Sequence, residues 1–421
     1  MASNGLRRRR VLLSAYACGP GEGSEPGAGW AFAEAAAVTS EVWVLTRKRF
    51  RDAITRRLDE DQELARWLHP VYIDLPDPLL RLKRSHRDVY WYYPLWQRLA
   101  GRTAGRLHSE HRFDVAHHVT FAVDWMPCGL ASLPPSVPLI WGPVGGATST
   151  PVTMYPALGV SGVASELVRR CIGSVLRRAF GDSTASRAAL VVALNDDVRR
   201  RFEHRARVVV EPNAALMDQP PAELRHVDAP APDYRAVFIG RLVTWKGTRL
   251  ALQAVAEKGN ERWRLDYYGE GADRRWLERQ VLKRGLSDRV RLHGQVPRAE
   301  IFRVMREADL LLFPSMHDSA PWTVAEASTL GLPAVVLDLG GPAHLAGRTG
   351  IVVPRGARPV PRIARALASH TRTDHRIADD RWSVRRLPEM LDGWYESVTA
   401  PDPRLSDEAA GMSPAQESVT R

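Results

Sequence analysis

The chain alternates short apolar runs with Gly- or Pro-rich turns and helical segments. The first run, VLLSAYA at 11–17, is followed by a Gly-rich loop, the helical pattern WAFAEAAAV and a second run, EVWVLT at 41–46. Nearly continuous apolar runs of this length are typical of strands buried in a parallel sheet. The order strand, loop, helix, strand therefore predicts an α/β protein that begins with a Rossmann-like unit.

A similar order returns around residue 313. An apolar run ends at Phe313, and the loop Pro-Ser-His-Asp-Ser follows it. A helix is predicted from Pro321, with Ser319 as its N-cap, and a Gly-Leu-Pro turn ends it before the next strand. Asp318 is thus expected just after a strand and Glu326 in the first turns of a helix, where parallel sheets bind ligands. From spacing alone, an N-capping Asp and a solvated helix Glu are the simpler interpretation.

Two basic residues follow another predicted strand. The run RAVFI ends before Gly240, and Arg241 and Lys246 come next, before a helix. Cations beside a strand end and a helix N-terminus are suited to bind a diphosphate. The pattern is weak by itself, and the two acidic residues farther along the chain strengthen it.

Composition marks the boundaries between domains. Residues 215–234 are Pro-rich and lack periodicity, which is typical of a linker. We therefore expect an N-terminal domain over 1–214 and a second Rossmann-like domain over 235–384. A last helix is expected over 385–398, and the polar residues 399–421 are expected to be disordered.

Overall composition narrows the class of protein. The 421 residues are 44% apolar and 25% charged, which is ordinary for a soluble globular protein of two or three domains. The net charge is +11, but no nucleic-acid-binding motif is present, so we expect no nucleic-acid partner. Three scattered cysteines fit a reducing compartment without disulfides or a zinc site.

The N-terminus imitates a signal peptide, because Arg7–Arg10 precede the first apolar run. That run is at the short end of the usual range and leads directly into the Gly-rich loop, so we interpret it as a strand. No stretch approaches the roughly 18–20 apolar residues of a transmembrane helix. We expect a cytoplasmic protein with at most weak peripheral contact to the inner membrane face.

Two segments leave alternatives open. Residues 79–110 interleave aromatic residues with arginines, which fits a membrane-surface or acceptor-docking segment or else helices packed on the sheet. Pro94 interrupts any single amphipathic helix there and favours packing. Asp59, Glu60 and Asp61 look like a metal-binding DxD motif, but their polar helical surroundings favour a solvated acidic face.

The stretch around residue 320 resembles the signature of the family 4 retaining glycosyltransferases, which have the GT-B fold. Asp318, seven further residues, Glu326, Ala327 and the turn Gly331–Leu332–Pro333 match that motif, with Asp in place of the first Glu. The resemblance covers about residues 11–398. It implies two Rossmann-like domains that face a central cleft, with the C-terminal helix crossing back to the first domain.

The resemblance also implies roles for individual residues. Arg241 and Lys246 would bind the donor phosphates, Asp318 the donor sugar and Glu326 the ribose. Further donor-binding positions are implied at Gly23, Ser24, Gly240, Val296, Ala320, Pro321 and Trp322, and acceptor-side positions at Glu25, Trp141, Gly145 and Gly146.

A histidine after the strand FDVAHHVTF is expected near the reaction centre in this family. His118 is favoured and His117 is the alternative. Since neighbouring strand residues point to opposite faces, only one of them is expected to face the cleft.

We therefore expect a retaining, hexosyltransferase-type glycosyltransferase. It would move a hexose or N-acetylhexosamine from a nucleotide-diphosphate sugar, with UDP favoured, to a saccharide hydroxyl, with no metal or other cofactor. The acceptor would be a cell-envelope or exopolysaccharide precursor or a small aminoglycoside-type natural product. The alternative is a catalytically inactive GT-B protein that binds sugar or nucleotide, for which the shorter Asp318 is the main support.

The first domain offers candidate groups for either kind of acceptor. A polycationic acceptor would want acidic residues such as Glu22, Glu25 or Asp124. A lipid-linked acceptor would instead use the aromatic residues and arginines of 79–110.

Overall fold

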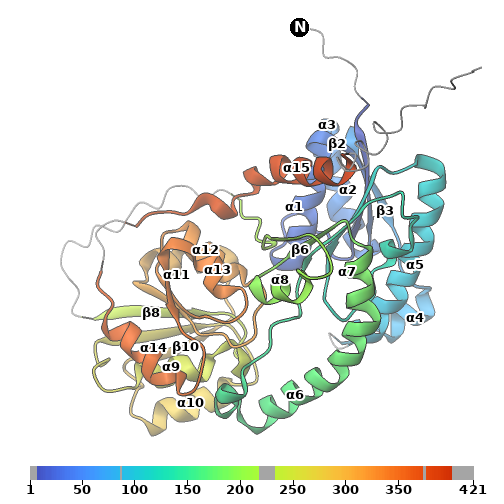
Figure 1. The fold of residues 1–421 in the computed structure, drawn as a ribbon. Helices are drawn as coiled ribbons and strands as arrows, with labels where there is room; N and C mark the ends of the chain where they lie inside the picture. The colour runs from blue at the N-terminus through green and yellow to red at the C-terminus, as the bar shows by residue number, and fades with distance from the viewer. Residues whose placement is uncertain (1–6, 86–87, 218–232, 373–375, 401–421) are drawn as a thin grey trace, which may run out of the picture.

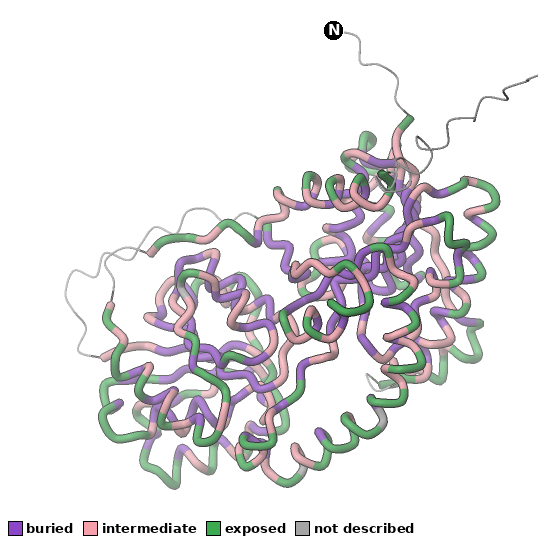
Figure 2. Tube along the Cα trace, viewed as in Figure 1, coloured by how far each residue is buried: buried purple, intermediate pink, exposed green. Residues whose placement is uncertain are grey.

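The computed structural model describes residues 7–85, 88–217, 233–372 and 376–400. Two parallel sheets form the centres of two α/β halves, with helices packed around each sheet (Figure 1). The strands are mostly buried and form the cores of the two halves (Figure 2). The predicted α/β class with two Rossmann-like units is confirmed.

The first sheet has seven strands in the order β3-β2-β1-β4-β5-β6-β7, and every neighbouring pair is parallel. Its strands are β1 (Arg9–Ala15), β2 (Ser40–Thr46), β3 (Leu68–Tyr72), β4 (Val115–Thr120), β5 (Leu139–Val144), β6 (Leu190–Ala193) and β7 (Val208–Val210). The helices of this half are α1 (Ser24–Thr39), α2 (Arg51–Glu60), α3 (Gln62–Trp67), α4 (Asp77–Leu82), α5 (Val89–His111), α6 (Tyr155–Leu176), α7 (Ser183–Arg187) and α8 (Asp196–Phe202).

The second sheet has six strands in the order β10-β9-β8-β11-β12-β13, again all parallel. Its strands are β8 (Tyr234–Ile239), β9 (Trp263–Tyr268), β10 (Val290–Gly294), β11 (Leu310–Phe313), β12 (Ala334–Leu337) and β13 (Gly350–Val353). The helices of the C-terminal part are α9 (Thr248–Val255), α10 (Arg274–Lys283), α11 (Arg298–Glu307), α12 (Trp322–Thr329), α13 (Pro342–Ala346), α14 (Pro359–Ala368) and α15 (Leu387–Thr399).

Small residues let α1 approach the first sheet closely. A Cβ atom on Gly29 would lie 2.0 Å from the carbonyl oxygen of Ala17, so only glycine fits at that position. After Gly29, most of the buried residues of α1 are alanines. The Gly-rich loop is therefore held firmly at the carboxyl edge of the first sheet.

The last helix, α15, returns to the first half and packs beside α1 (Figure 1). Arg9 of β1 pairs with Asp392 at 2.8 Å, and the hydroxyl of Tyr395 lies 3.1 Å from Nδ1 of His117. Tyr395 is fully buried there. The prediction that the C-terminal helix crosses back to the first domain is confirmed.

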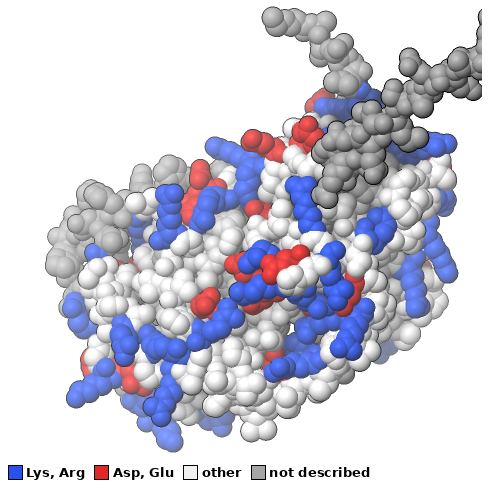
Figure 3. Space-filling model, viewed as in Figure 1, with Lys and Arg blue, Asp and Glu red and all other residues white. Residues whose placement is uncertain are grey.

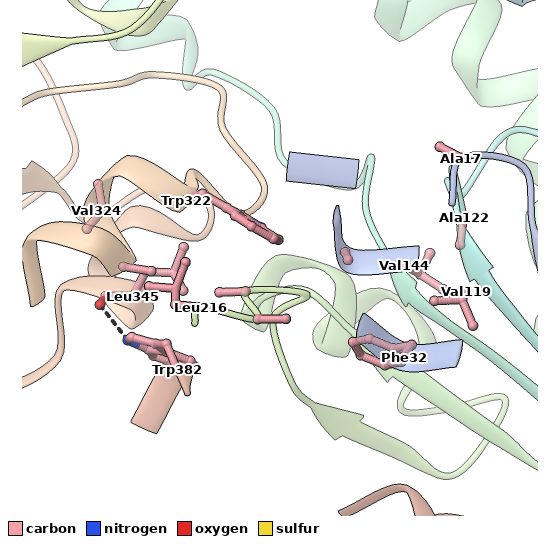
Figure 4. Close-up of a cluster of buried hydrophobic side chains, with 14 of the residues drawn as sticks. Ala17, Phe32, Val119, Ala122, Val144, Leu216, Trp322, Val324, Leu345 and Trp382 are labelled. Atoms are coloured by element: carbon pink, nitrogen blue, oxygen red, sulfur yellow. Dashed lines mark hydrogen bonds between the residues drawn. The ribbon is translucent and has the colours of Figure 1, made fainter. Parts of the chain in front are cut away.

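The chain passes between the halves along two adjacent segments. The amide of Leu216 donates to the carbonyl of Trp382 at 2.8 Å, and the indole of Trp382 donates to the carbonyl of Leu345 at 3.1 Å (Figure 4). The outgoing and returning connections are thus tied to each other and to the second half. Most of the predicted linker and most of the predicted C-terminal tail lie outside the described residues.

Helix α12, which carries Glu326, starts one residue later than predicted. Pro321 is the N-cap residue and α12 begins at Trp322, and Ser319 makes no capping bond. The carbonyl of Ser319 instead accepts a hydrogen bond from Asn195 of the first half at 3.1 Å. Packing between the halves therefore fixes this loop where a local cap was expected.

The two ambiguous segments are now placed. Asp61 accepts the amide of Leu64 as the N-cap of α3 and pairs with Arg57, in agreement with the solvated acidic interpretation. In 79–110, α5 buries Tyr92 and its neighbours, as packing requires, whereas α4 has no buried residue. In the described ranges, every helix is too short or too polar to span a bilayer.

Charges are mixed on the face shown in Figure 3. Basic side chains are scattered over both halves rather than gathered in one stripe. Acidic side chains gather around α8, where Asp196 pairs with Arg199 and Asp197 pairs with Arg200. The net positive charge therefore does not form a single continuous basic surface on this face.

Candidate functional site

The carboxyl edge of the second sheet brings a lysine and a carboxylate together. Lys246 ends a single 3₁₀ turn after β8, and Asp318 lies in the loop after β11, the neighbouring strand. The Lys246 ammonium donates to Oδ2 of Asp318 at 2.7 Å, and the hydroxyl of Ser315 donates to the same oxygen at 3.2 Å. Both charged side chains are only about one-seventh exposed, at 14% and 15%. The two predicted residues thus form a largely buried ion pair.

Arg241 lies beside this pair and is exposed. Its guanidinium carbon is 5.4 Å from the centroid of the Trp245 ring, which holds the side chain over the loop. Among the described residues no carboxylate lies within ion-pair distance of Arg241. Gly240 precedes it with a φ of +149°, which a residue with a side chain rarely adopts. The cation is thus available to an anionic ligand.

Glu326 is buried in α12 and pairs with Arg298, the first residue of α11. Burial raises the pKa of the Glu326 carboxyl, and the Arg298 guanidinium opposes that rise. Sequence reasoning missed Arg298, because nothing in its local pattern distinguishes it from a surface arginine. Its place at the start of the helix after β10, on the same sheet edge, was the one available signal.

The Gly-rich loop of the first half reaches across to these residues. A Cβ on Gly23 would lie 2.5 Å from a guanidinium nitrogen of Arg298. A Cβ on Gly27 would lie 2.1 Å from the carbonyl oxygen of Glu22 and 3.3 Å from the Trp322 ring. Gly23 and Gly27 therefore lie against Arg298 and Trp322 of the second half, and a side chain at Gly27 would collide with the backbone of Glu22. Ser24, with a φ of +58°, is exposed at the start of α1.

A chain of hydrogen bonds joins the two halves at this point. The indole of Trp322 donates to Oδ1 of Asn213 at 3.4 Å, and the Asn213 amide nitrogen donates to Oε1 of Glu25 at 3.1 Å. The other carboxylate oxygen of Glu25 accepts the amide of Phe121 at 3.0 Å. Burial raises the pKa of Glu25, and the Phe121 amide opposes this. Asn213 was not predicted, since it becomes informative only once the halves are packed.

Both predicted histidines lie in the interior of the first half. His117 is 0% exposed, with Nε2 at 2.9 Å from the carbonyl oxygen of Gly142, and His118 is 1% exposed, with Nε2 at 3.1 Å from the Tyr93 hydroxyl. They point to opposite faces of β4, as expected, but helices cover both faces. Contrary to the prediction, neither imidazole is exposed to a cleft. Burial lowers the pKa of His117 to about 4 and that of His118 to about 3.

Trp141 also departs from its predicted place on the acceptor side. Its side chain is 1% exposed and packs edge to face with Phe202 of α8, with ring centroids 5.3 Å apart. Because β5 is covered on both faces, this large ring belongs to the core. The glycines that follow β5 do reach the boundary between the halves.

Gly145 and Gly146 lie where the first half meets the loop that carries Asp318. A Cβ on Gly145 would lie 3.2 Å from the Ser319 hydroxyl oxygen. Gly146 has a φ of +102°, and a Cβ there would collide with Asp124. Thr150 adds a bond from its hydroxyl to the carbonyl of Met316 at 3.2 Å. The structure therefore brings these glycines together with the acidic loop.

The remaining predicted donor positions line the same loop and edge. Ala320 is half-buried and Pro321 is buried beside it, where the amide of Gly341 donates to the carbonyl of Asp318 at 2.9 Å. Val296 is half-buried just after β10. Within the described ranges, no three His, Cys, Asp or Glu side chains cluster closely enough to hold a metal ion.

Comparison with known proteins agrees with this architecture. Residues 233–370 match the family described as glycosyl transferases group 1. A 2-deoxystreptamine glucosyltransferase of Streptomyces kanamyceticus is 32% identical over 213 residues, which are 49% of this chain and 53% of that protein. A protein of Bacillus subtilis named as a teichuronic acid biosynthesis glycosyltransferase, TuaC, is 30% identical over 39% of this chain and 37% of its own. The chain thus spans about half or less of these curated relatives.

Solved structures extend the likeness to both halves. The Anabaena protein HepE, solved in complex with UDP, has a TM-score of 0.52 and 17% identity, and the match covers 92% of this chain and all of HepE. At that identity the match shows the fold alone. Residues 233–370 thus match the group 1 glycosyl transferase family, and the two parallel sheets with the returning helix have the GT-B fold.

Proposed function

We propose that the protein is a retaining glycosyltransferase that moves a hexose or N-acetylhexosamine from a UDP-sugar to a saccharide hydroxyl. The observation that carries this proposal is the group of charged residues at one edge of the second sheet. Arg241, the Lys246–Asp318 pair and Glu326 all lie there, opposite the Gly-rich loop of the first half. Two cations and two carboxylates match the parts of a nucleotide-sugar donor.

Each side chain has a distinct part in this proposal. Arg241 and Lys246 bind the diphosphate and neutralise the charge that develops on it as the sugar leaves. Asp318 accepts hydrogen bonds from the sugar hydroxyls. Glu326 accepts the ribose hydroxyls once Arg298 has released it. Since the cations supply positive charge, the reaction is proposed to need no metal ion.

The comparisons support this donor chemistry and leave two classes of acceptor. HepE is described in complex with UDP, which is consistent with a UDP-sugar donor here. Among relatives, one is named for 2-deoxystreptamine and another for teichuronic acid. We accordingly propose a saccharide acceptor of natural-product or cell-envelope type. A cytoplasmic location with weak membrane contact stays a prediction.

Binding of UDP to the purified full chain tests the donor site. UDP and UDP-glucose are expected to raise the midpoint of thermal unfolding, because a ligand that binds only the folded state stabilises it by mass action. Uridine is expected to stabilise much less, since it lacks the diphosphate. GDP and dTDP serve as competing nucleotides, and a larger shift with either would change the proposed donor.

Variants separate the donor site from general stability. Arg241→Ala and Glu326→Gln are expected to reduce the UDP-induced shift, whereas Lys258→Ala, at an exposed position after α9, is expected to leave it unchanged. If no nucleotide shifts the transition, the donor assignment fails. If nucleotides bind but no sugar is transferred or hydrolysed, the catalytically inactive alternative replaces it.

A further inference from the structure

A pocket lies at the carboxyl edge of the first sheet, separate from the residues proposed to bind the donor. It has a volume of about 650 Å³, within the usual range for small-molecule sites. Tyr16 follows β1, Arg47 and Arg49 follow β2, and Phe121 follows β4, so the ends of three adjacent strands form its base. Lys83, after α4, is part of the wall. This is where an open parallel sheet binds ligands, and the donor residues above do not occupy it.

Most of the cations that line this pocket have no carboxylate partner. Arg47 is neutralised by Asp74, with 2.8 Å between Nε and Oδ1, and both side chains are buried. Arg49, Lys83 and Arg84 also line the pocket, and no described carboxylate lies within ion-pair distance of them. Three cationic groups therefore remain without a counter-charge.

Lys83 is the most constrained of these cations. Its ammonium donates to the hydroxyl of Tyr16 at 2.8 Å and lies 4.6 Å from the centroid of the Tyr92 ring. Burial, with Arg47 and Arg49 nearby, lowers the pKa of Lys83 to about 8. A positive group held half-buried among like charges is stabilised by any anion that enters the pocket.

The acidic residues that a cationic acceptor would need are not available in the pocket. Glu25 is the one carboxylate in its lining, and hydrogen bonds from Phe121 and Asn213 already occupy both of its oxygens. Asp124 is fully buried and lies 2.8 Å from Arg177 and 3.1 Å from Arg201. Of the three acidic residues considered for a polycationic acceptor, Glu25 and Asp124 are thus already paired, whereas Glu22 is exposed and outside the pocket lining.

Packed aromatic rings form the base of the pocket. Tyr16 packs edge to face against Tyr93, Trp96 and Phe121, each with ring centroids 5.1 Å away. These contacts fix the ring of Tyr16 beside the cations. The pocket thus has a rigid aromatic base, and its half-buried apolar lining residues Leu80, Val89 and Phe121 lie next to several positive groups.

The first turn of α1 connects this pocket with the donor edge. Glu25 and Pro26 line the pocket, while Gly27 contacts the ring of Trp322 in α12. A molecule that fills the pocket therefore lies against the start of α1, whose Gly23 and Gly27 contact the second half. An acceptor hydroxyl that extends past this turn would approach the donor held by Asp318 and Lys246.

We propose that the pocket lined by Tyr16, Arg47, Arg49, Lys83, Arg84 and Phe121 binds an acceptor sugar that carries a phosphate or carboxylate group. This inference rests on the proposed glycosyl transfer and names its acceptor class. The sugar ring packs against the half-buried lining residues Leu80, Val89 and Phe121, and the oxyanion contacts Arg49 and Lys83. The pocket thereby favours an anionic saccharide over a polyamine glycoside.

The source of such an oxyanion is a soluble sugar or a lipid-linked sugar phosphate. The half-buried apolar side chains of Leu80 and Val89, on both sides of Lys83 in the chain, also line the pocket. An alkyl chain on the phosphate would contact them. The shared chemistry is the anionic saccharide, and an added alkyl chain distinguishes the two sources.

Binding of four monosaccharide probes by calorimetry, with the donor site saturated by UDP, tests the proposal. Glucose 1-phosphate and glucuronate carry the anion, glucose is neutral and glucosamine is cationic. At equal ionic strength, at least one anionic sugar is expected to bind about tenfold or more tightly than glucose, and glucosamine no better than glucose. Decyl glucosyl phosphate binding more tightly than glucose 1-phosphate would assign the lipid-linked source, and equal affinity would assign the soluble one.

Charge-removing variants link the preference to the pocket. R49Q/K83Q is expected to remove most of the preference for anionic sugars while UDP binding is unchanged. R102Q/R106Q, at exposed positions on α5 outside the pocket, is the matched control and is expected to retain the preference. UDP binding is measured first, so failure of the donor site is recognised separately.

Four results would overturn the proposal. Glucose or glucosamine could bind as tightly as the anionic sugars, or none of the probes could bind to UDP-saturated protein. Inorganic phosphate could match glucose 1-phosphate, which would make the pocket a simple anion site rather than an acceptor site. Unchanged anion preference in R49Q/K83Q would also place the binding elsewhere.

Discussion

The ion pair between Lys246 and Asp318 allows a test that separates stability from catalysis. Replacing Lys246 with Met keeps the side-chain length and removes the charge, so Asp318 retains only the hydroxyl of Ser315 as a partner. The reverse change, Asp318→Asn, removes the other charge. Combining both replaces the ion pair with neutral groups of similar volume.

The expected magnitude follows from burial. Exposed ion pairs contribute about 0–1 kcal/mol, whereas removal of one member of a fully buried pair costs about 3–5 kcal/mol. With 14% and 15% of the side chains exposed, Lys246→Met is expected to cost about 1–3 kcal/mol. That corresponds to a fall in Tm of about 2–4 °C for each kcal/mol. The double variant is expected to recover at least half of the loss.

Turnover is expected to behave differently. Lys246 stabilises the charge that develops on the leaving diphosphate, so its loss is expected to lower turnover about 10²–10³-fold. The double variant restores stability and leaves turnover low, because the neutral pair cannot bind the diphosphate. Release of UDP from UDP-glucose measures turnover, thermal unfolding measures stability, and the exposed Lys258→Met is the control.

Two outcomes would refute this reasoning. Turnover of Lys246→Met within about threefold of the parent would remove the diphosphate clamp, since charge stabilisation at the leaving group is worth far more. A double variant as unstable as Lys246→Met would show that the pair is not the source of the lost stability. Each outcome rejects one of the two roles and leaves the other intact.

Three further predictions follow from the site. Arg298→Ala is expected to tighten UDP binding up to about fivefold by calorimetry, because it frees Glu326 from a pair that is half exposed on the arginine side; weaker binding would mean that Arg298 itself contacts UDP. Asn213→Ala is expected to cost about 1–3 kcal/mol in urea unfolding, since it leaves buried partners unsatisfied, and no loss would contradict the link between the halves. The pKa of His117 is lowered to about 4, so between pH 6.5 and 4 the unfolded chain binds a proton that the folded chain does not, and stability rises with pH through that window. His117→Gln is expected to flatten that slope in urea unfolding at pH 5 and 7.5, and an unchanged slope would contradict it.

The sequence was informative wherever function follows strand order. Lys246 and Asp318 are far apart in the chain, yet each follows a strand, and the two strands are neighbours in the second sheet. The rule that ligands gather at the carboxyl ends of parallel strands was therefore enough to predict that they meet. The position of Glu326 was predicted by the same rule, because Glu326 lies on the helix that follows the loop of Asp318.

The burial of individual side chains, which depends on packing between elements, could not be predicted in this way. His117 and His118 were placed on the correct strand with opposite orientations, but their burial depends on helices that cover both faces of the sheet. Trp141 fails for the same reason. Arg298 has no local pattern at all, since it gains a role only when Glu326 lies beside it.

The charge that an acceptor would meet depends on which side chains pair with each other on folding. Acidic residues such as Glu25 and Asp124 suggest a cationic acceptor as long as only their positions in the chain are known. In the folded protein, Asp124 forms ion pairs with Arg177 and Arg201, and both carboxylate oxygens of Glu25 accept hydrogen bonds. What matters for a ligand is the charge that remains unpaired after folding, and in the lining of the proposed acceptor pocket that charge is positive.

The hydrogen-bonded link between Glu25 and Trp322 connects the positively charged pocket of the first half with the proposed donor site. Asn213 bonds to both, so the carboxylate at the edge of the acceptor pocket is tied to the first residue of the helix that carries Glu326. An acceptor that displaces Glu25 would loosen Trp322, and a donor that moves α12 would shift Glu25. The two binding sites therefore share one hydrogen-bonded connection, and occupancy of one is expected to change the affinity of the other.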